Sequence, residues 1–182
     1  GRLVLSIAAG TPISYFEHQL GANTAVVRAM PNTPASIGHG ITVLCANTHV
    51  SAEQRARCEI LIGAVGQVEW IEDESLMDAV TAVSGSGPAY VFLLIEVLAQ
   101  AGISAGLAAD LANRLALTTV VGAGALAEQT EDSPTVLRQN VTSPGGTTAA
   151  ALEVLMADDG LQQLMAKAVT AAKERGRELA IA

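Results

Sequence analysis

The sequence has 182 residues, of which 50% are hydrophobic and only 3% are aromatic, and its formal net charge is −8. A nucleic-acid partner is not expected, because the sequence shows no basic patch that could neutralise phosphates. Cys45 and Cys58 do not form a Cys-x-x-Cys pair, and the three histidines are scattered. These residues predict neither a disulfide framework nor a metal site, and they fit a reducing cytoplasm.

The two most apolar stretches are Tyr90–Ala105 and Leu115–Ala127. The first contains Glu96 and Gln100, and the second is too short to cross ~30 Å of hydrocarbon as a helix. We therefore expect two buried helices, or helices at a subunit interface, and no association with a membrane. No signal peptide is expected at the start of the sequence.

The first part of the sequence, residues 1–71, alternates between strand and helix patterns. Short apolar runs typical of parallel strands occupy 3–8, 24–30, 40–46 and 67–71. Helices are expected at 11–20, with Thr11 as the N-cap, and at 51–64, where Ser51 and Gln54 have the spacing of a capping box. Between the second and third strands, two prolines and two glycines in 31–40 predict an irregular loop.

From residue 72 onward, the patterns predict helices alone. They are expected at about 74–84, 87–103, 107–129, 133–141, 146–157 and 159–180. The fold class is therefore α/β followed by all-α, with an α/β domain at 1–71 and a helical domain at 72–182. Four strands with two helices leave one face of an open parallel sheet poorly covered, and no Gly-x-Gly-x-x-Gly motif is present. The simplest interpretation is the remnant of a Rossmann-type sheet whose first mononucleotide-binding half lies upstream.

The segment TSPGGTT, residues 142–148, directly precedes an alanine-rich helical run. Gly145 and Gly146 allow a ligand to approach the backbone closely, and the start of the helix offers free N–H groups to a carboxylate. The hydroxyl groups of Ser143, Thr147 and Thr148 add donors and acceptors. The alternative is an ordinary helix start with a hydroxyl residue as its N-cap, and the residues alone leave both interpretations open.

Three further segments have both a functional and a structural interpretation. Segments 6–10 (SIAAG) and 28–36 (RAMPNTPAS) each follow a predicted strand, where open α/β sheets bind ligands, but each could be a plain turn. Segment 82–92 (AVSGSGPAYVF) is similar in kind to segment 142–148, but it could also be a close-packed helix junction. Glu131 and Asp132 precede a predicted helix, where acidic residues favour the helix dipole.

The segments MPNTPA (30–35), AVSGSGPAYVF (82–92) and VTSPGGTT (141–148), with SIAAG before them, resemble pyrroline-5-carboxylate reductase. The resemblance covers essentially the whole chain. It implies the reduction of 1-pyrroline-5-carboxylate to L-proline with NADPH or NADH, in the cytoplasm and without a metal. It also implies a Rossmann domain followed by a helical dimerisation domain, in homodimers that assemble further into a decamer.

The resemblance also implies roles for individual residues. Thr148 would hydrogen-bond the ring nitrogen of the substrate, and Glu131 would lie near that nitrogen. Other residues expected to contact the substrate are Ser143, Gly145, Gly146, Thr147 and, less directly, Thr81. Residues expected to contact the cofactor within the same subunit are Ile7, Ala8, Ala9, Asn32 and Thr33. Asn140 is expected to contact the cofactor from the partner subunit.

The sequence departs from the family at its start, because the glycine-rich phosphate loop is absent from these residues. The chain by itself is therefore expected to be an inactive fragment of the parent enzyme. Two alternatives remain. One is another imine or 2-hydroxyacid reductase, which a cationic side chain in the substrate pocket would favour. The other is a non-catalytic helical oligomerisation module, which self-association without ligand binding would favour.

Overall fold

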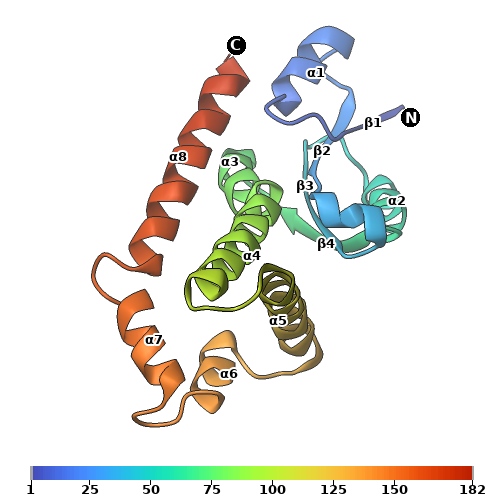
Figure 1. The fold of residues 1–182 in the computed structure, drawn as a ribbon. Coiled ribbons are helices and arrows are strands. Elements are labelled where there is room, and N and C mark those ends of the chain that lie inside the picture. Colours follow the sequence, from blue (N-terminus) through green and yellow to red (C-terminus); the bar gives the residue numbers. More distant parts are fainter. Residues whose placement is uncertain (1, 182) are drawn as a thin grey trace. The chain divides into compact units, whose positions relative to one another are not determined.

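The computed structural model describes residues 2–181 (Figure 1). These residues form two compact units: the first comprises the chain up to Pro88 together with the residues from Lys167 onward, and the second is Ala89–Ala166. The predicted fold class, an α/β part followed by helices, is confirmed.

The first unit is built on a four-stranded sheet in the order β1-β2-β3-β4. The strands are β1 (Leu3–Ser6), β2 (Ala25–Met30), β3 (Gly40–Ala46) and β4 (Gly66–Ile71). β1 pairs with β2 in parallel and β3 pairs with β4 in parallel, but β2 and β3 are antiparallel. The expectation of a parallel sheet is thus wrong at its centre. The connection between β2 and β3 holds only the short 3-10 helix η1 (Thr33–Ile37), and parallel neighbours need a crossover of a dozen residues or more.

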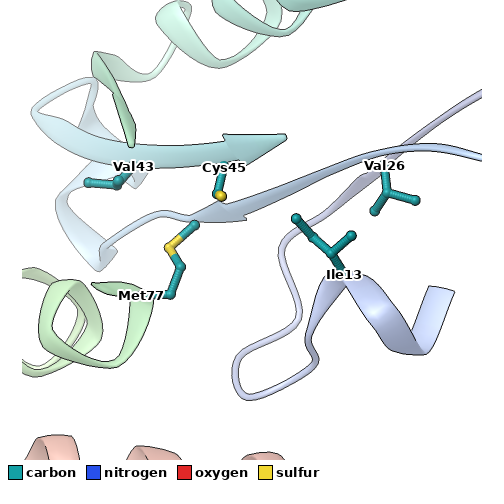
Figure 2. Packing of buried hydrophobic residues seen from close by; sticks show 5 residues of the cluster. All are labelled: Ile13, Val26, Val43, Cys45 and Met77. Atoms are coloured by element: carbon teal, nitrogen blue, oxygen red, sulfur yellow. The ribbon is translucent and has the colours of Figure 1, made fainter. Parts of the chain in front are cut away.

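Both faces of the sheet carry a hydrophobic core, because alternate residues of a strand point to opposite faces. On one face, Val26, Val43 and Cys45 pack with Ile13 of α1 (Ile13–Leu20) and with Met77 (Figure 2). On the other face, a second set packs against α2 (Ala52–Gly63); its buried members are Val27, Ala29, Leu44 and Cys58. The expectation of one poorly covered face is therefore wrong, since the chain returns to the α1 face after β4.

The two helices of the sheet region begin in different ways. At α2, the predicted capping box is confirmed: Ser51 Oγ accepts from Gln54 N at 3.2 Å, and Gln54 Oε1 accepts from Ser51 N at 2.9 Å. At α1, the predicted N-cap Thr11 is wrong, because the N-cap is Pro12. The first free donor of α1 is the N–H group of Ile13, and it donates to Glu74 Oε1 at 2.9 Å. Glu74 lies 61 positions further along the chain.

The helical part follows the prediction closely. The region expected to be one helix at 74–84 comprises three short ones: η2 (Glu74–Leu76), α3 (Met77–Val80) and the π-helical turn η3 (Thr81–Gly85). The remaining helices are α4 (Gly87–Ser104), α5 (Ala109–Gln129), α6 (Pro134–Asn140), α7 (Thr147–Leu155) and α8 (Leu161–Ile181). The last turns of α8 belong to the first unit, where Arg177 Nε lies 3.9 Å from Asp78 Oδ2.

The two apolar stretches, expected to be buried helices or helices at a subunit interface, are largely exposed in the single chain. In α4, Ala99 is the one buried residue among those that the structure describes. Large apolar side chains exposed on α4 are Val91, Phe92, Leu93, Leu94, Val97 and Leu98. A set of large exposed apolar side chains on one helix is typical of a site covered by another molecule.

The helical stretch Glu74–Ser104 is, within the described residues, long and apolar enough to cross a membrane. Length and composition are weak evidence by themselves, because core helices of soluble proteins pass the same test. The stretch is also not one regular helix, since 3-10 and π-helical turns interrupt it before Gly87.

Candidate active site

The segments expected to contact the cofactor follow two neighbouring parallel strands. Ser6 of β1 pairs with Arg28 of β2, so both strands end at the same edge of the sheet. Residues 7–9, all exposed, follow β1, and Asn32 and Thr33 follow β2. β3 and β4 run in the opposite direction, so their carboxyl ends lie at the other edge. Segments 6–10 and 28–36 therefore follow the same edge of the sheet, because β1 and β2 are parallel neighbours.

The side chain of Asn32 makes two hydrogen bonds within the first unit. Its Oδ1 accepts from Ile41 N at 3.0 Å, at the start of β3. Its Nδ2 donates to Ser84 Oγ at 3.4 Å, on the π-helical turn. Since an amide nitrogen carries two donors, one N–H group remains for a ligand. Asn32 thus holds the loop between β2 and β3 in place, whatever it contacts besides.

Thr81 lies at the start of the π-helical turn, with its hydroxyl group bound to its own helix. Thr81 Oγ1 donates to Met77 O at 2.8 Å, and its carbonyl accepts from Ser86 N, also at 2.8 Å. The second bond spans five residues and defines the π-helical geometry, which occurs frequently at functional sites. The hydroxyl oxygen keeps its capacity to accept a hydrogen bond from a ligand.

The loop before α7 is a tight turn formed by Ser143–Gly146. Gly146 N donates to Ser143 O at 3.0 Å, Pro144 takes the second position, and Gly145 takes the third with φ +67°. A positive φ at this position is the mark of a type II turn and favours glycine. The turn therefore accounts for Gly145, and it occupies the N–H group of Gly146.

The start of α7 is free of a side-chain cap among the described residues. Its N-cap is Gly146, and the N–H groups of the first helical turn, beginning with Thr147 and Thr148, have no intrahelical partners. Thr148 is partly buried, whereas Thr147 and Ser143 are exposed. These amides, at the positive end of the helix dipole, form a suitable site for a carboxylate, and the hydroxyl groups nearby can complete it.

Glu131 and Asn140 flank the same region of the sequence within the second unit. Glu131 is exposed in the link between α5 and α6, and Asn140 is the last residue of α6, also exposed. α6 has its own cap, since Ser133 Oγ accepts from Val136 N at 3.4 Å, so the N-cap of this helix is not Glu131. The expected substrate residues thus lie in the second unit, except for Thr81, which belongs to the first unit with residues 7–9, Asn32 and Thr33.

A well-formed cavity of the first unit lies away from this site. It has a volume of about 690 Å³ and lies at the opposite edge of the sheet, beside the start of β2 and the start of α2. Arg2, Ala25, His49 and Arg57 are among its lining residues, and none of the expected site residues is. Within the same described residues, no group of three or more His, Cys, Asp or Glu side chains is placed to hold a metal ion.

Two contacts of the first unit were not found from the sequence. Arg28 is buried, and its Nη1 lies 2.9 Å from Glu74 Oε1. The available signal was a charged residue inside an apolar strand, because a buried charge requires a partner. The second contact is between Ser84 and Asn32. A serine offers no comparable signal, since serines are common in turns and helix starts.

The model of the family described as "Pyrroline-5-carboxylate reductase dimerisation" matches residues 74–179. The pyrroline-5-carboxylate reductase of Pseudomonas aeruginosa is 48% identical over 98% of this chain, and that of Synechocystis sp. is 46% identical over 97%. In both comparisons, the chain spans 65% of the relative's length.

Solved structures agree with these relatives. The pyrroline-5-carboxylate reductase of Coxiella burnetii has a TM-score of 0.92 at 45% identity. The match covers 97% of this chain and 65% of the Coxiella burnetii chain. The Plasmodium falciparum enzyme, solved with NADP bound, has a TM-score of 0.87 at 34% identity; the match covers 98% of this chain and 70% of that one. The chain therefore belongs to the pyrroline-5-carboxylate reductase family.

Proposed function

We propose that this chain is the substrate-binding and dimerising part of a reductase that converts 1-pyrroline-5-carboxylate to L-proline with NADPH or NADH. The observation that carries the proposal is the uncapped start of α7 behind the Ser143–Gly146 turn. The substrate has one carboxylate, and this helix start offers unpaired N–H groups to one anion. The names of the relatives supply the reaction.

In this proposal, the first helical turn of α7 fixes the substrate. The N–H groups of Thr147 and Thr148, with the hydroxyl of Ser143, hold the carboxylate, and Gly145 and Gly146 form the turn that presents them. The Thr148 hydroxyl hydrogen-bonds the ring nitrogen, which must carry a proton in the product. Glu131 favours the positive charge of a protonated imine, and Thr81 lines the pocket.

On the cofactor side, the small side chains that follow the carboxyl end of β1 leave room for a nicotinamide ring. Ala8 and Ala9 are exposed there with Ile7, and Asn32 and Thr33 follow the neighbouring strand. These residues, with Asn140 of the partner subunit, would hold the cofactor. NADPH or NADH, when bound, supplies the hydride that reduces the imine carbon. The chain contributes chiefly the orientation of the two bound molecules, which is the main requirement for hydride transfer.

The same proposal includes a homodimer, with dimers assembling into a decamer in the cytoplasm. It is supported by the exposed apolar side chains of α4 and by the dimerisation family that matches residues 74–179. We expect residues 72–182 to dimerise at micromolar concentration, because their exposed apolar helices require a partner. Sedimentation velocity measures this directly, and a monomer would contradict it.

We further propose that residues 1–71 are the end of a dinucleotide-binding domain and that residues 72–182 form the helical domain. The phosphate-binding half would come from the amino-terminal region that the relatives possess beyond this chain. The chain joined to that region is called the intact reductase below. NADPH oxidation with 1-pyrroline-5-carboxylate should be absent for the 182-residue chain and present for the intact reductase. Turnover by the chain alone would contradict the proposal that the phosphate-binding half lies in the amino-terminal region. No turnover by the intact reductase would contradict the proposed reaction.

The second candidate function is a non-catalytic oligomerisation module, which the exposed apolar surface of α4 favours. It predicts self-association of the chain, with no binding of L-proline to the intact reductase. Calorimetric titration with L-proline separates the two functions, because the α7 site should bind its carboxylate.

A further inference from the structure

One face of β2 and its continuation contacts the segment 74–85 at three successive positions. Arg28, Met30 and Asn32 are two residues apart, so they project to the same face of an extended chain. Arg28 Nη1 pairs with Glu74 Oε1 at 2.9 Å, and Asn32 Nδ2 donates to Ser84 Oγ at 3.4 Å. The contacts therefore continue past the end of the strand into the loop expected to face the cofactor.

Met30 occupies the middle position and lies against Gly85. A Cβ atom placed on Gly85 would come within 2.5 Å of Met30 Cε, so the absence of a side chain allows this approach. Met30 is also packed against the core cluster that contains Met77. The loop after β2 is thus seated on the end of the helical segment by packing as well as by hydrogen bonding.

The π-helical turn explains how two neighbouring residues reach the same loop. Ser86 N bonds to Thr81 O, so the turn holds one more residue than an α-helical turn. Within that turn, Ser84 contacts Asn32 and Gly85 contacts Met30. The π-helical turn therefore contacts the end of β2 and the loop after it at two positions, Met30 and Asn32.

The bond from Asn32 to Ser84 also fixes the orientation of the amide. Ile41 N requires the oxygen of Asn32 on its side, and Ser84 Oγ accepts from the nitrogen on the other side. Removal of the serine hydroxyl would free one end of this bridge and leave the Asn32 amide held only by its bond from Ile41 N. The effect would reach Thr33, which directly follows Asn32.

We propose that Ser84 is a positioning residue for the cofactor: through the Asn32 amide it holds the loop at Asn32 and Thr33 in the form that binds the nicotinamide side. The inference rests on the proposed function, because the cofactor contacts of this loop are part of it. Ser84 itself need not contact the cofactor or the substrate.

The test is the dissociation constant for NADPH of the intact reductase, measured by the fluorescence of bound NADPH. Ser84→Ala should raise it by about two- to tenfold, the range for one lost hydrogen bond. Ser84→Thr, which keeps the hydroxyl, should restore most of the affinity. The matched control is Ser104→Ala, because Ser104 Oγ bonds to Gln100 O of its own helix at 3.0 Å. This control should leave the dissociation constant unchanged.

A double-mutant cycle with Asn32 separates positioning from general loss of structure. If Ser84 acts through Asn32, Ser84→Ala should have no further effect once Asn32→Ala is present. Additive effects would overturn the inference, as would an unchanged dissociation constant in Ser84→Ala. If Ser84→Ala lowers the melting temperature, Ser84→Cys replaces it in the cycle, because its thiol is of similar size but is a much weaker hydrogen-bond acceptor. An intact reductase that binds no NADPH would instead contradict the proposed function, and the inference with it.

Discussion

The pair formed by Arg28 and Glu74 connects three parts of the first unit. Glu74 Oε1 accepts from Arg28 Nη1 and from Ile13 N, each at 2.9 Å, so one oxygen joins β2, the start of α1 and the segment after β4. The Arg28 side chain is 8% exposed and that of Glu74 is 30% exposed. Glu74→Ala would therefore leave a buried guanidinium and the start of α1 without their common acceptor.

The expected loss of unfolding free energy is about 3 kcal/mol. Removing one partner of a buried pair costs about 3–5 kcal/mol, and the partial exposure of Glu74 places this case at the lower end. The loss of an acceptor for Ile13 N contributes about 1 kcal/mol of that total. For a chain of this length, each kcal/mol lowers the melting temperature by about 2–4 °C, so a decrease of about 6–12 °C is expected.

A matched control lies two positions away. Glu72 pairs with Arg55 at 3.2 Å, but the side chain of Glu72 is 81% exposed. Glu72→Ala should cost less than about 1 kcal/mol, because exposed ion pairs contribute little. Glu74→Gln keeps an acceptor oxygen while it removes the charge, so its effect should fall between the two alanine variants.

The assay is urea unfolding followed by circular dichroism at one fixed protein concentration, since self-association also contributes to stability. If Glu74→Ala and Glu72→Ala differ by less than about 0.5 kcal/mol, the assignment of a buried, structurally required pair is refuted. That result would mean that Arg28 finds water or another acceptor once the carboxylate is gone.

Two other predictions concern the site and the cysteines. Thr148→Ala should lower the kcat of the intact reductase at least about tenfold and leave the NADPH dissociation constant unchanged, because in the proposed function the hydroxyl assists a proton at the ring nitrogen; kinetics equal to those of the parent would contradict this role. Burial raises the pKa of the Cys45 and Cys58 thiols above the ordinary value of 9.0, with Glu74 and Glu59 adding to the respective shifts. As the pH rises, the thiols of the unfolded chain therefore lose their protons before those of the folded chain. The unfolding free energy should then fall as the pH rises above 9.0. Urea unfolding at a series of pH values should show a shallower fall for Cys45→Ala and for Cys58→Ala than for the parent.

Features that depend on neighbouring residues could be predicted from the sequence. The capping box of Ser51 and Gln54 is an example, because both hydrogen bonds join residues three positions apart. The extents of the helices after residue 86 follow from periodicity and from glycines between them. The type II turn was not predicted, although Pro144 and Gly145 are typical residues for its second and third positions.

Features that depend on distant partners could not be predicted. Thr11 was expected to start α1, but the acceptor for Ile13 comes from Glu74, which no local pattern connects with it. The direction of β3 relative to β2 was also missed, since apolar runs do not state the direction of a strand. The exposure of α4 could not be read from composition, because a buried helix and an interface helix have the same apolar residues.

The loop before α7 separates into a part that the fold explains and a part that it does not. The turn requires Gly145 and uses the N–H group of Gly146, so these features alone give no evidence for a ligand. The N-cap is different. Serine or threonine there would satisfy a free N–H group, yet glycine in its place costs only a few tenths of a kcal/mol. The N-cap glycine therefore leaves the amides of α7 open at little expense in stability, and a carboxylate is the natural partner for them.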